Sequence, residues 1–415
     1  MPPLKGLQSK PVIRFNSHGF TKIRYSMERL KTNPNAARIL GQISQNSGIS
    51  RVEIAKNLSL DKSTLTPIVG RLVASGIVEE TAQGQAGSKG GRRPVELQIN
   101  ANYGCILGLD ITCHGFQAVV LNLEGEAVYH ESNNLSISGT SLAATVIEIS
   151  KSINENLSQK GFQLLGIGVG ITGIVNYHEG VILHSDLFNI HEPLPLSQQV
   201  SLEVNLPVYI ENDANCCGWS ELSARRKKNG ENFLCLFLRY WDAVQGVRAE
   251  SHYGLGLGIV LDGKIYHGSN YAAGEFRSIY AENGTTNHFS VSDEDLKDIH
   301  NSQFLARISD ELARHIEFLV NTLDLANVVL IDTLRDQDTN MKSIISDAIR
   351  HRWSTYRDTE FQVLESAFGE KEVAYGAADM VLVRIFNASL NNGNSKSQQP
   401  NGLSILLPDS TPVVS

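Results

Sequence analysis

The hydrophobic positions between residues 35 and 47 recur every three or four residues, a spacing that predicts a helix with one apolar face. Its inward positions are Ala36, Ile39, Leu40 and Ile43. Gly48 ends this run, because glycine readily adopts the conformation that follows a helix. A second helix is expected from Ser50, where Ser50 and Glu53 have the spacing of a capping box. Its expected apolar face carries Val52, Ile54, Ala55 and Leu58.

A third helix is predicted over residues 62–75, after a tight turn at Ser59 and Leu60. Asp61 can cap its start and Gly76 can end it, although Pro67 in the second turn removes one backbone donor. Its inward positions are Leu65, Ile68, Val69 and Leu72. Two short helices joined by a brief polar turn predict a helix-turn-helix.

The outward positions at the start of this third helix suit a recognition helix. They are Lys62, Ser63, Thr64 and Thr66. Small hydroxyl side chains and one lysine can reach base edges and phosphates in the major groove without steric conflict. Strands are expected at 77–80 and 95–99, and the glycine-rich stretch between them carries Arg92 and Arg93. This stretch is typical of a wing that contacts phosphates or a narrow minor groove.

The distribution of charge also favours a nucleic-acid-binding module at the N-terminal end. The first 100 of the 415 residues contain 15 lysines and arginines against 6 acidic residues, and the remainder contains 21 against 38. The net charge of −8 therefore combines a basic first quarter with an acidic body. We predict a basic arm over 1–33, a winged helix-turn-helix over 34–100 and a second domain over 101–415. A basic tail on an ordinary enzyme is the alternative that charge alone leaves open.

Composition narrows the class of protein further. Hydrophobic residues make up 41% of the chain and charged residues 19%, as in a soluble globular protein. No apolar run is long enough for a transmembrane helix, and the N-terminus lacks the apolar core of a signal peptide, so we expect a cytoplasmic protein without a membrane partner. The five cysteines are odd in number and lack metal-ligand spacing, which fits reduced thiols.

The acidic domain contains two similar sets of strands. The first set is expected at 106–111, 116–121, 126–129 and 164–169, with a helix over 141–157 before its last strand. The second set is expected at 233–238, 254–261 and 328–331, with helices near 293–324 and 374–386. A domain built twice from hairpins followed by helical crossovers is typical of the α/β ribonuclease-H-like architecture of sugar kinases and actin-like ATPases. We therefore predict two lobes with a cleft near residues 211–215.

A buried strand over Val208–Ile210 delivers Asn212 and Asp213 to its carboxyl end, where open α/β sheets bind ligands. Asn offers both a donor and an acceptor, and Asp accepts or acts as a base, so the pair suits a polyhydroxylated ligand such as a sugar. An Asx turn that caps the following helix is the other interpretation. Cys216 and Cys217 are expected to be small helix residues packed inward.

An ordered set of motifs resembles the ROK family (repressors, open reading frames, kinases), specifically its winged-helix transcriptional regulators. In chain order these motifs are SRVEIAKNLSLDKSTLTPIVGRLVASGIV, GGRRP, GLDI, IENDAN, GIVLDGKIYHGSNYAAGE and AFGEKEVAYGAA. In family kinases the residue matching Asp213 is the base that deprotonates the sugar. The resemblance also implies that the residues matching Asn212, Glu275 and Gly173 contact the sugar.

The chain departs from the family at its nucleotide and metal elements. The first phosphate turn, D-x-G-G-T in family kinases, is Asp110-Ile111-Thr112-Cys113-His114 here, and side chains replace the close backbone approach. Extra residues precede Gly254, and Asp332 follows a strand where a glycine pair is usual. The family zinc cluster is missing after Glu275, and His288 alone is expected to be a surface residue. We therefore expect no cofactor: no metal and no ATP, with Asp213 retained as a non-catalytic ligand contact.

These features together predict a DNA-binding transcriptional regulator, a repressor of carbohydrate-related genes. Its partners would be a double-stranded DNA operator and a sugar or sugar-phosphate effector, and the resemblance implies a homodimer or tetramer. The effector would close the cleft around Asp213 and change the spacing of two winged helices. The alternatives are a ligand-independent DNA-binding regulator and an active ROK sugar kinase.

Overall fold

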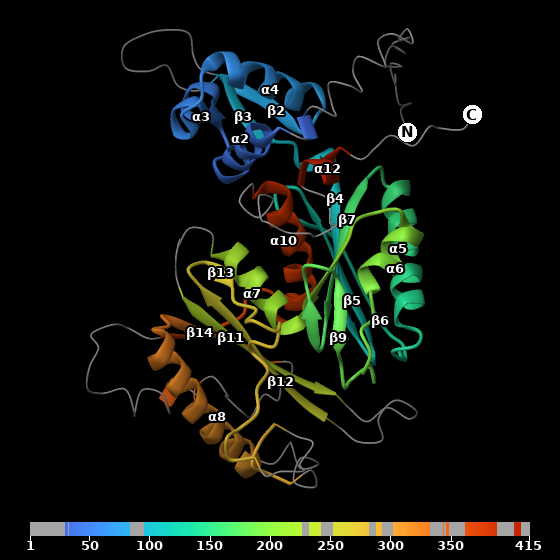
Figure 1. The fold of residues 1–415 in the computed structure, drawn as a ribbon, viewed down its shortest axis with the longest axis vertical. Helices are drawn as coiled ribbons and strands as arrows, with labels where there is room; N and C mark the ends of the chain where they lie inside the picture. Colours follow the sequence, from blue (N-terminus) through green and yellow to red (C-terminus); the bar gives the residue numbers. More distant parts are fainter. Residues whose placement is uncertain are drawn as a thin grey trace, which may run out of the picture. The chain divides into compact units, whose positions relative to one another are not determined.

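The computed structural model describes residues 30–31, 33–83, 95–225, 232–241, 252–281, 288–292, 302–332, 343, 346–347, 362–387 and 402–407. The expected wing residues Arg92 and Arg93 and most of the expected arm lie outside this described part. The chain divides into two compact units, Met1–Gln98 with Asn401–Ser415, and Ile99–Pro400 (Figure 1). Residues 401–415, which we had assigned to the acidic domain, thus group with the first unit.

Residues 33–99 of the first unit form helices and a small sheet in the part that the structure describes. The helices are α2 (Pro34–Gln45), α3 (Arg51–Leu58) and α4 (Lys62–Ala74), and the strands are β1 (Ile49–Ser50), β2 (Val78–Gln83) and β3 (Val95–Ile99). The sheet has the order β1-β3-β2, and β1 runs antiparallel to β3. Three helices with a following β-hairpin form a winged helix-turn-helix, as predicted. A short helix, α12 (Gly402–Leu406), also belongs to this unit.

Local sequence signals explain where these helices begin and end. Asn33 caps α2 by accepting a hydrogen bond from the Asn35 amide, and Pro34 occupies the first helical position. The capping box of α3 is confirmed: Ser50 N donates to Glu53 Oε2 over 2.9 Å, and Glu53 N donates to Ser50 Oγ over 3.3 Å. Asp61 precedes α4, but its side chain makes no capping hydrogen bond.

One predicted core residue of α3 is wrong. Val52 is 62% exposed, whereas Ile54 is fully buried. The two positions are two residues apart, and this places them on opposite sides of a helix with 3.6 residues per turn. The predicted inward residues of α2 and α4 are confirmed as buried: Ala36, Ile39, Leu40, Ile43, Leu65, Ile68, Val69 and Leu72.

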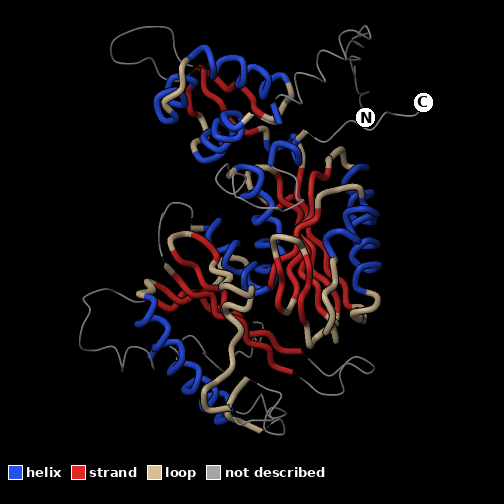
Figure 2. The backbone as a smooth tube through the Cα atoms, in the orientation of Figure 1, coloured by secondary structure: helices blue, strands red, loops and turns tan. Residues whose placement is uncertain are grey.

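The second unit contains two five-stranded sheets with the same strand plan (Figure 2). The first sheet comprises β4 (Cys105–Thr112), β5 (Gly115–Asn122), β6 (Ala127–Asn134), β7 (Leu164–Ile171) and β10 (Val208–Asn212) in the order β10-β7-β4-β5-β6. The second comprises β11 (Phe233–Trp241), β12 (His252–Leu261), β13 (Lys264–Ile265), β14 (Asn327–Asp332) and β15 (Gln362–Glu365) in the order β13-β12-β11-β14-β15. In each sheet an antiparallel hairpin continues into parallel strands. This repetition confirms the predicted two-lobed ribonuclease-H-like fold.

Helices cover the outer faces of both sheets. Helices α5 (Leu142–Gln159) and α6 (Leu196–Val204) pack against the first sheet, and α8 (Ser302–Leu323) packs against the second (Figure 1). A small hairpin of β8 (Ile174–Asn176) and β9 (Val181–His184) follows β7. Short 3₁₀ turns lie at Ala101–Tyr103 and Gly369–Lys371. Within the described residues, no helix has the length and apolar character needed to cross a membrane.

Helices α7 (Asp213–Ala224) and α10 (Glu372–Phe386) pack against each other and join the cores of the two lobes. Their approach is very close, because a methyl group on Gly376 would lie 1.7 Å from the carbonyl oxygen of Cys216. Cys216 and Cys217 are fully buried here, which confirms their predicted packing role. Burial raises the pKa of both thiols well above its usual value, so they are poor nucleophiles.

Candidate functional site

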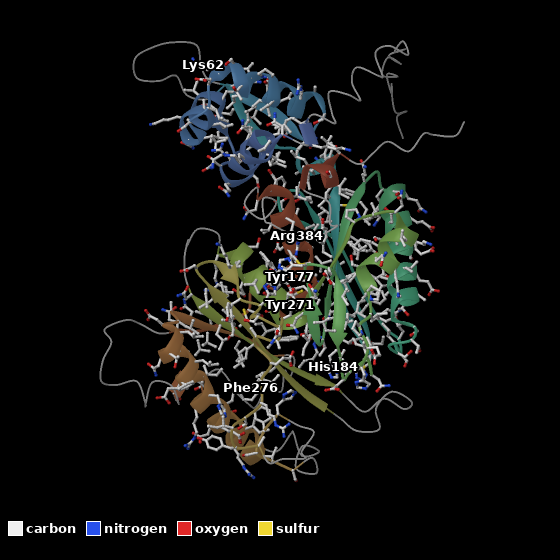
Figure 3. All side chains as sticks on the ribbon, viewed as in Figure 1. Lys62, Tyr177, His184, Tyr271, Phe276 and Arg384 are labelled. Carbon is white, nitrogen blue, oxygen red and sulfur yellow. The ribbon has the colours of Figure 1, made fainter. Side chains whose placement is uncertain are left out.

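The start of α4 presents the predicted recognition surface. Four residues on it are exposed: Lys62, Ser63, Thr64 and Thr66 (Figure 3 labels Lys62). The opposite face of α4 is anchored in the core of the winged helix by its buried leucines, Leu65 and Leu72. Pro67 lies inside the helix and is itself exposed, so the missing backbone donor lies on the solvent side. The helix therefore offers small polar side chains on a firmly held backbone.

A cleft with a volume of about 180 Å³ lies in the second unit and is lined by residues from both lobes. The first lobe contributes the ends of β7 and β9 and the junction between β10 and α7, while the second lobe contributes β11, β12 and Glu275. All four predicted ligand-binding residues line it: Gly173, Asn212, Asp213 and Glu275. The structure thus brings together residues separated by up to about a hundred positions in the sequence.

Asn212 has a structural role at the junction of β10 and α7. Its Oδ1 accepts a hydrogen bond from Asn215 N over 3.1 Å and caps α7, as the Asx interpretation predicted. Its Nδ2 donates to the Gly173 carbonyl over 3.0 Å. Gly173 has φ +131°, and a Cβ atom there would lie 2.3 Å from the His184 carbonyl oxygen. Asn212 and Gly173, both predicted ligand contacts, are therefore joined by a hydrogen bond at the wall of the cleft.

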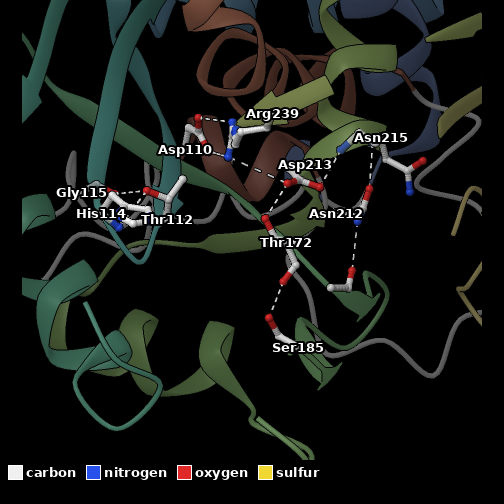
Figure 4. Close-up of polar contacts among 12 residues, drawn as sticks. Asp110, Thr112, His114, Gly115, Thr172, Ser185, Asn212, Asp213, Asn215 and Arg239 are labelled. Atoms are coloured by element: carbon white, nitrogen blue, oxygen red, sulfur yellow. Dashed lines mark hydrogen bonds and ion pairs between the residues drawn. The ribbon is translucent and has the colours of Figure 1, made fainter. Parts of the chain in front are cut away.

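Asp213 lies at the first position of α7 and is 5% exposed. Its Oδ2 accepts a hydrogen bond from Thr172 Oγ1 over 2.6 Å, and its Oδ1 accepts one from Ala214 N over 2.9 Å. Ser185 Oγ in turn donates to the Thr172 carbonyl over 2.6 Å (Figure 4). These contacts fix the carboxylate and leave it at the surface of the cleft.

Arg239 is the residue of this site that the sequence analysis missed. Its Nη2 and Nη1 donate to the two carboxylate oxygens of Asp110 over 2.6 and 3.2 Å (Figure 4). The Nη1 atom also lies 3.9 Å from Asp213 Oδ2. Burial alone would lower the pKa of Arg239, but the charges of Asp110 and Asp213 raise it above its usual value. Arg239 therefore remains a cation between two carboxylates.

A second cavity, with a volume of about 330 Å³, lies on the other side of Arg239. Its lining residues are Asp110, Thr112, His114, Gly115, Phe116, Gln117, Ser132, Asn134, Arg239 and Glu370. The turn after β4, which the family resemblance leads us to expect as an altered phosphate turn, lines this cavity. Thr112 Oγ1 donates to the Gly115 carbonyl over 3.2 Å and accepts from His114 N over 3.2 Å (Figure 4). The turn is thus closed by its own side chain.

Glu211 directly precedes Asn212 and is fully buried. Its Oε2 lies 2.8 Å from His267 Nε2, and its Oε1 accepts from Asn212 N over 2.9 Å. Burial raises the pKa of Glu211, but His267 and the hydrogen bonds from Asn212 and Asn215 together outweigh burial and leave the pKa below its usual value. Tyr177 stacks on the His267 ring, with centroids 3.7 Å apart (Figure 3 labels Tyr177).

Glu275 is exposed to the open cleft. The surrounding protein and the negative charges of Asp213 and Asp186 raise the pKa of its carboxyl group. His288, which we expected at the surface, is half-buried and lines the same cleft. Its Nδ1 lies 2.6 Å from the Phe276 carbonyl oxygen, so it packs as part of the cleft wall.

Family comparisons agree with this architecture. The description "ROK family" matches residues 106–288, and "Winged helix-turn-helix DNA-binding" matches residues 33–79. The xylose repressor of Staphylococcus xylosus is 33% identical over 246 residues, which is 59% of each chain. The xylose repressor of Bacillus subtilis strain 168 is 22% identical over 380 residues, which is 84% of this chain and 94% of that protein.

The fold has a counterpart among solved structures. A crystal structure described as a ROK family transcriptional regulator, homolog of the E. coli MLC protein, matches with a TM-score of 0.65 and 19% identity. The match covers 85% of this chain and 96% of that one. The alignment to the first three xylose repressors spans only 57–59% of their length. The chain contains a ROK family domain preceded by a winged helix-turn-helix.

Proposed function

We propose that the protein is a DNA-binding transcriptional repressor of sugar-related genes whose ROK domain binds a sugar or sugar derivative without phosphorylating it. The exposed polar surface at the start of α4, within a winged helix-turn-helix, is the observation that carries the DNA-binding part. The names of the matched relatives make xylose the first effector to test. A homodimer or tetramer would place two winged helices on one operator.

The loss of kinase chemistry is part of this proposal. Phosphoryl transfer needs groups that cradle and neutralise the phosphates of a nucleotide. Here the carboxylate of Asp110 is held by Arg239, and the turn after β4 is closed by Thr112. Both features support a ROK domain without ATP and an Asp213 that contacts ligand without acting as a base. No cysteine occurs between Glu275 and Asp295, so we propose that the family zinc site is absent as well.

The test of DNA binding uses the double variant Lys62→Ala, Thr66→Ala in the full-length protein. We expect at least tenfold weaker operator binding in an electrophoretic or anisotropy titration, and a shallower salt dependence by about one phosphate contact. Lys151→Ala is the matched control, because Lys151 is an exposed lysine on α5. The variant Arg92→Ala, Arg93→Ala should likewise weaken binding and flatten its salt dependence. Equal affinity of the α4 variant and the control would reject α4 as the recognition helix.

The effector is sought by thermal shift against a panel of sugars and sugar phosphates, followed by DNA binding with each hit present. A true effector stabilises the protein by mass action and changes operator affinity. A protein that responds to no sugar but binds its operator would be a ligand-independent regulator. A coupled assay for ADP release addresses the kinase alternative: sugar-dependent turnover that is abolished by Asp213→Asn would overturn the non-catalytic assignment.

A further inference from the structure

Three potential metal ligands lie together at the edge of the cleft, far from the family zinc position in sequence. They are His184, Asp186 and His191, and their ligand atoms all lie within 4.8 Å of one another. His184 is half-buried, and the other two residues are exposed. His184 is labelled in Figure 3 at the end of β9. The spacing H-x-D-x₄-H does not by itself predict a metal site, because only the intervening turn brings the three side chains together.

The backbone explains why these three side chains share one face. Ser185 and Ile190 form an antiparallel bridge with hydrogen bonds of 2.9 and 2.8 Å. In that register His184 and His191 are direct cross-strand neighbours, whose side chains point to the same side. Asp186 follows His184 by two residues and therefore shares its face. A turn closed by the hydrogen bond from Asn189 N to the Asp186 carbonyl completes the loop.

The loop is anchored on its other side. Three of its residues are at most 8% exposed and belong to the core of the first lobe: Leu187, Phe188 and Ile190. The hydrogen bond from Ser185 Oγ to the Thr172 carbonyl ties the loop to the wall that holds Asp213. The three polar side chains are therefore presented by a fixed backbone, as a preorganised metal site requires.

The distances suit coordination of one ion. His184 Nε2 lies 3.0 Å from Asp186 Oδ1. Two ligands on a tetrahedral zinc ion with bonds of about 2.0–2.1 Å are separated by about 3.3 Å, so a small spreading of this pair admits the ion. His191 Nε2 lies 2.9 Å from Asn189 Oδ1. Metal-bound histidines commonly use one ring nitrogen for the metal and the other for such a hydrogen bond, which here leaves Nδ1 as the ligand atom.

We propose that His184, Asp186 and His191 form a binding site for a divalent transition-metal ion, with zinc as the best-fitting ion. Two imidazoles and one carboxylate match the preference of this class of ion, and three protein ligands leave at least one position open. His184 and Asp186 also line the cleft, beside Glu275. The open position can therefore accept a hydroxyl or carboxylate oxygen of a bound ligand. The site stands independently of the DNA-binding function.

The test measures zinc and cobalt binding by the untagged full-length protein after removal of metals with a chelator. We expect one zinc ion per chain, measured by atomic spectroscopy after dialysis against micromolar zinc. Cobalt should give visible absorption bands without an intense near-ultraviolet thiolate band, because the described cysteines are buried. His191→Ala and Asp186→Asn should each weaken zinc binding at least tenfold. Both side chains are exposed, so the variants should keep the unfolding temperature of the metal-free protein.

His130→Ala is the matched control, because His130 is an exposed histidine on β6 outside this cluster. The control variant should retain the wild-type zinc stoichiometry and affinity. Failure of the wild-type protein to retain zinc would overturn the proposal. Equal zinc binding by His191→Ala and the wild type would overturn it as well, since the ion would then be held elsewhere. Neither outcome would bear on operator binding.

Discussion

The two cavities on either side of Arg239 differ in how their acidic groups are compensated. In the cavity beside the turn after β4, Asp110 accepts two hydrogen bonds from the guanidinium. In the cleft that Asn212 and Glu275 line, Asp213 is 3.9 Å from the same guanidinium and is held mainly by a hydroxyl and a backbone amide. Glu275 adds a further carboxyl whose pKa is raised. Arg239 thus compensates the charge of Asp110 through two hydrogen bonds, whereas the carboxyl groups of Asp213 and Glu275 leave the cleft polar and acidic.

Under the proposed function, this difference allows the cleft around Asp213 to bind a sugar while the other cavity accepts no nucleotide phosphates. Arg239 on β11 lines both cavities, whereas β4, β5 and β6 line only the cavity beside the turn after β4, and β9, β10 and β12 line only the cleft around Asp213. The buried ion pair of Arg239 with Asp110 is expensive to break in a low-dielectric interior.

The largest effect is expected from Arg239→Ala, because this variant removes the side chain that separates the two cavities. The variant leaves Asp110 buried without its partner, and we expect a loss of about 3–5 kcal/mol in the free energy of unfolding of the second unit. Chemical denaturation followed by circular dichroism measures this loss. Arg314→Ala, which removes an exposed ion pair with Asp310, should have a much smaller effect. A similar small cost for both variants would contradict a buried, charged pair.

A smaller effect is expected from Glu372→Gln, which tests a buried acid that has neutral hydrogen-bond partners. Glu372 accepts hydrogen bonds from Ser220 Oγ and Phe368 N, and burial raises its pKa to about 7. Because the folded protein favours the protonated form, its stabilising contribution is complete below about pH 4.5 and is lost as the pH rises through 7. The variant should therefore be more stable than wild type at pH 8, by on the order of 2 kcal/mol, and nearly equal at pH 5. Denaturation curves at the two pH values decide this, and a pH-independent difference would refute it.

The smallest effect is expected from Asp213→Asn and sharpens the distinction between the two cavities. We expect about tenfold weaker binding of the effector sugar in calorimetry, because one charged hydrogen-bond acceptor is lost. Gln117→Ala, in the lining of the other cavity, should leave sugar affinity within about twofold. If both variants lost affinity equally, the sugar would not be confined to the cleft around Asp213.

Elements with strong local patterns could be predicted from the sequence. The capping box at Ser50, the inward face of α4 and its exposed polar start follow from residues within a few positions of one another. The two strand sets were also predicted, because buried strands are continuous apolar runs. β15 and the hairpin of β8 and β9 were missed, since short strands of mixed composition give a weak signal.

The polar contacts of the site could not be predicted, because they join distant parts of the chain. Asp110 and Arg239 are 129 positions apart, and only the folded sheets bring them together. An arginine directly after the apolar run of β11 was the available signal, since a charge at the end of a buried strand needs a partner. Asn212 could be placed correctly, but its capping bond and its tie to Gly173 required the position of β7.

The close contact between α7 and α10 also constrains how the cleft can move. With so little space between Gly376 and the Cys216 carbonyl, sliding one helix along the other would force a backbone atom into its neighbour. The contact therefore fixes the separation of the two helices at Gly376. Substitution of Gly376 by alanine would push the helices apart and would shift the two lobes that they join.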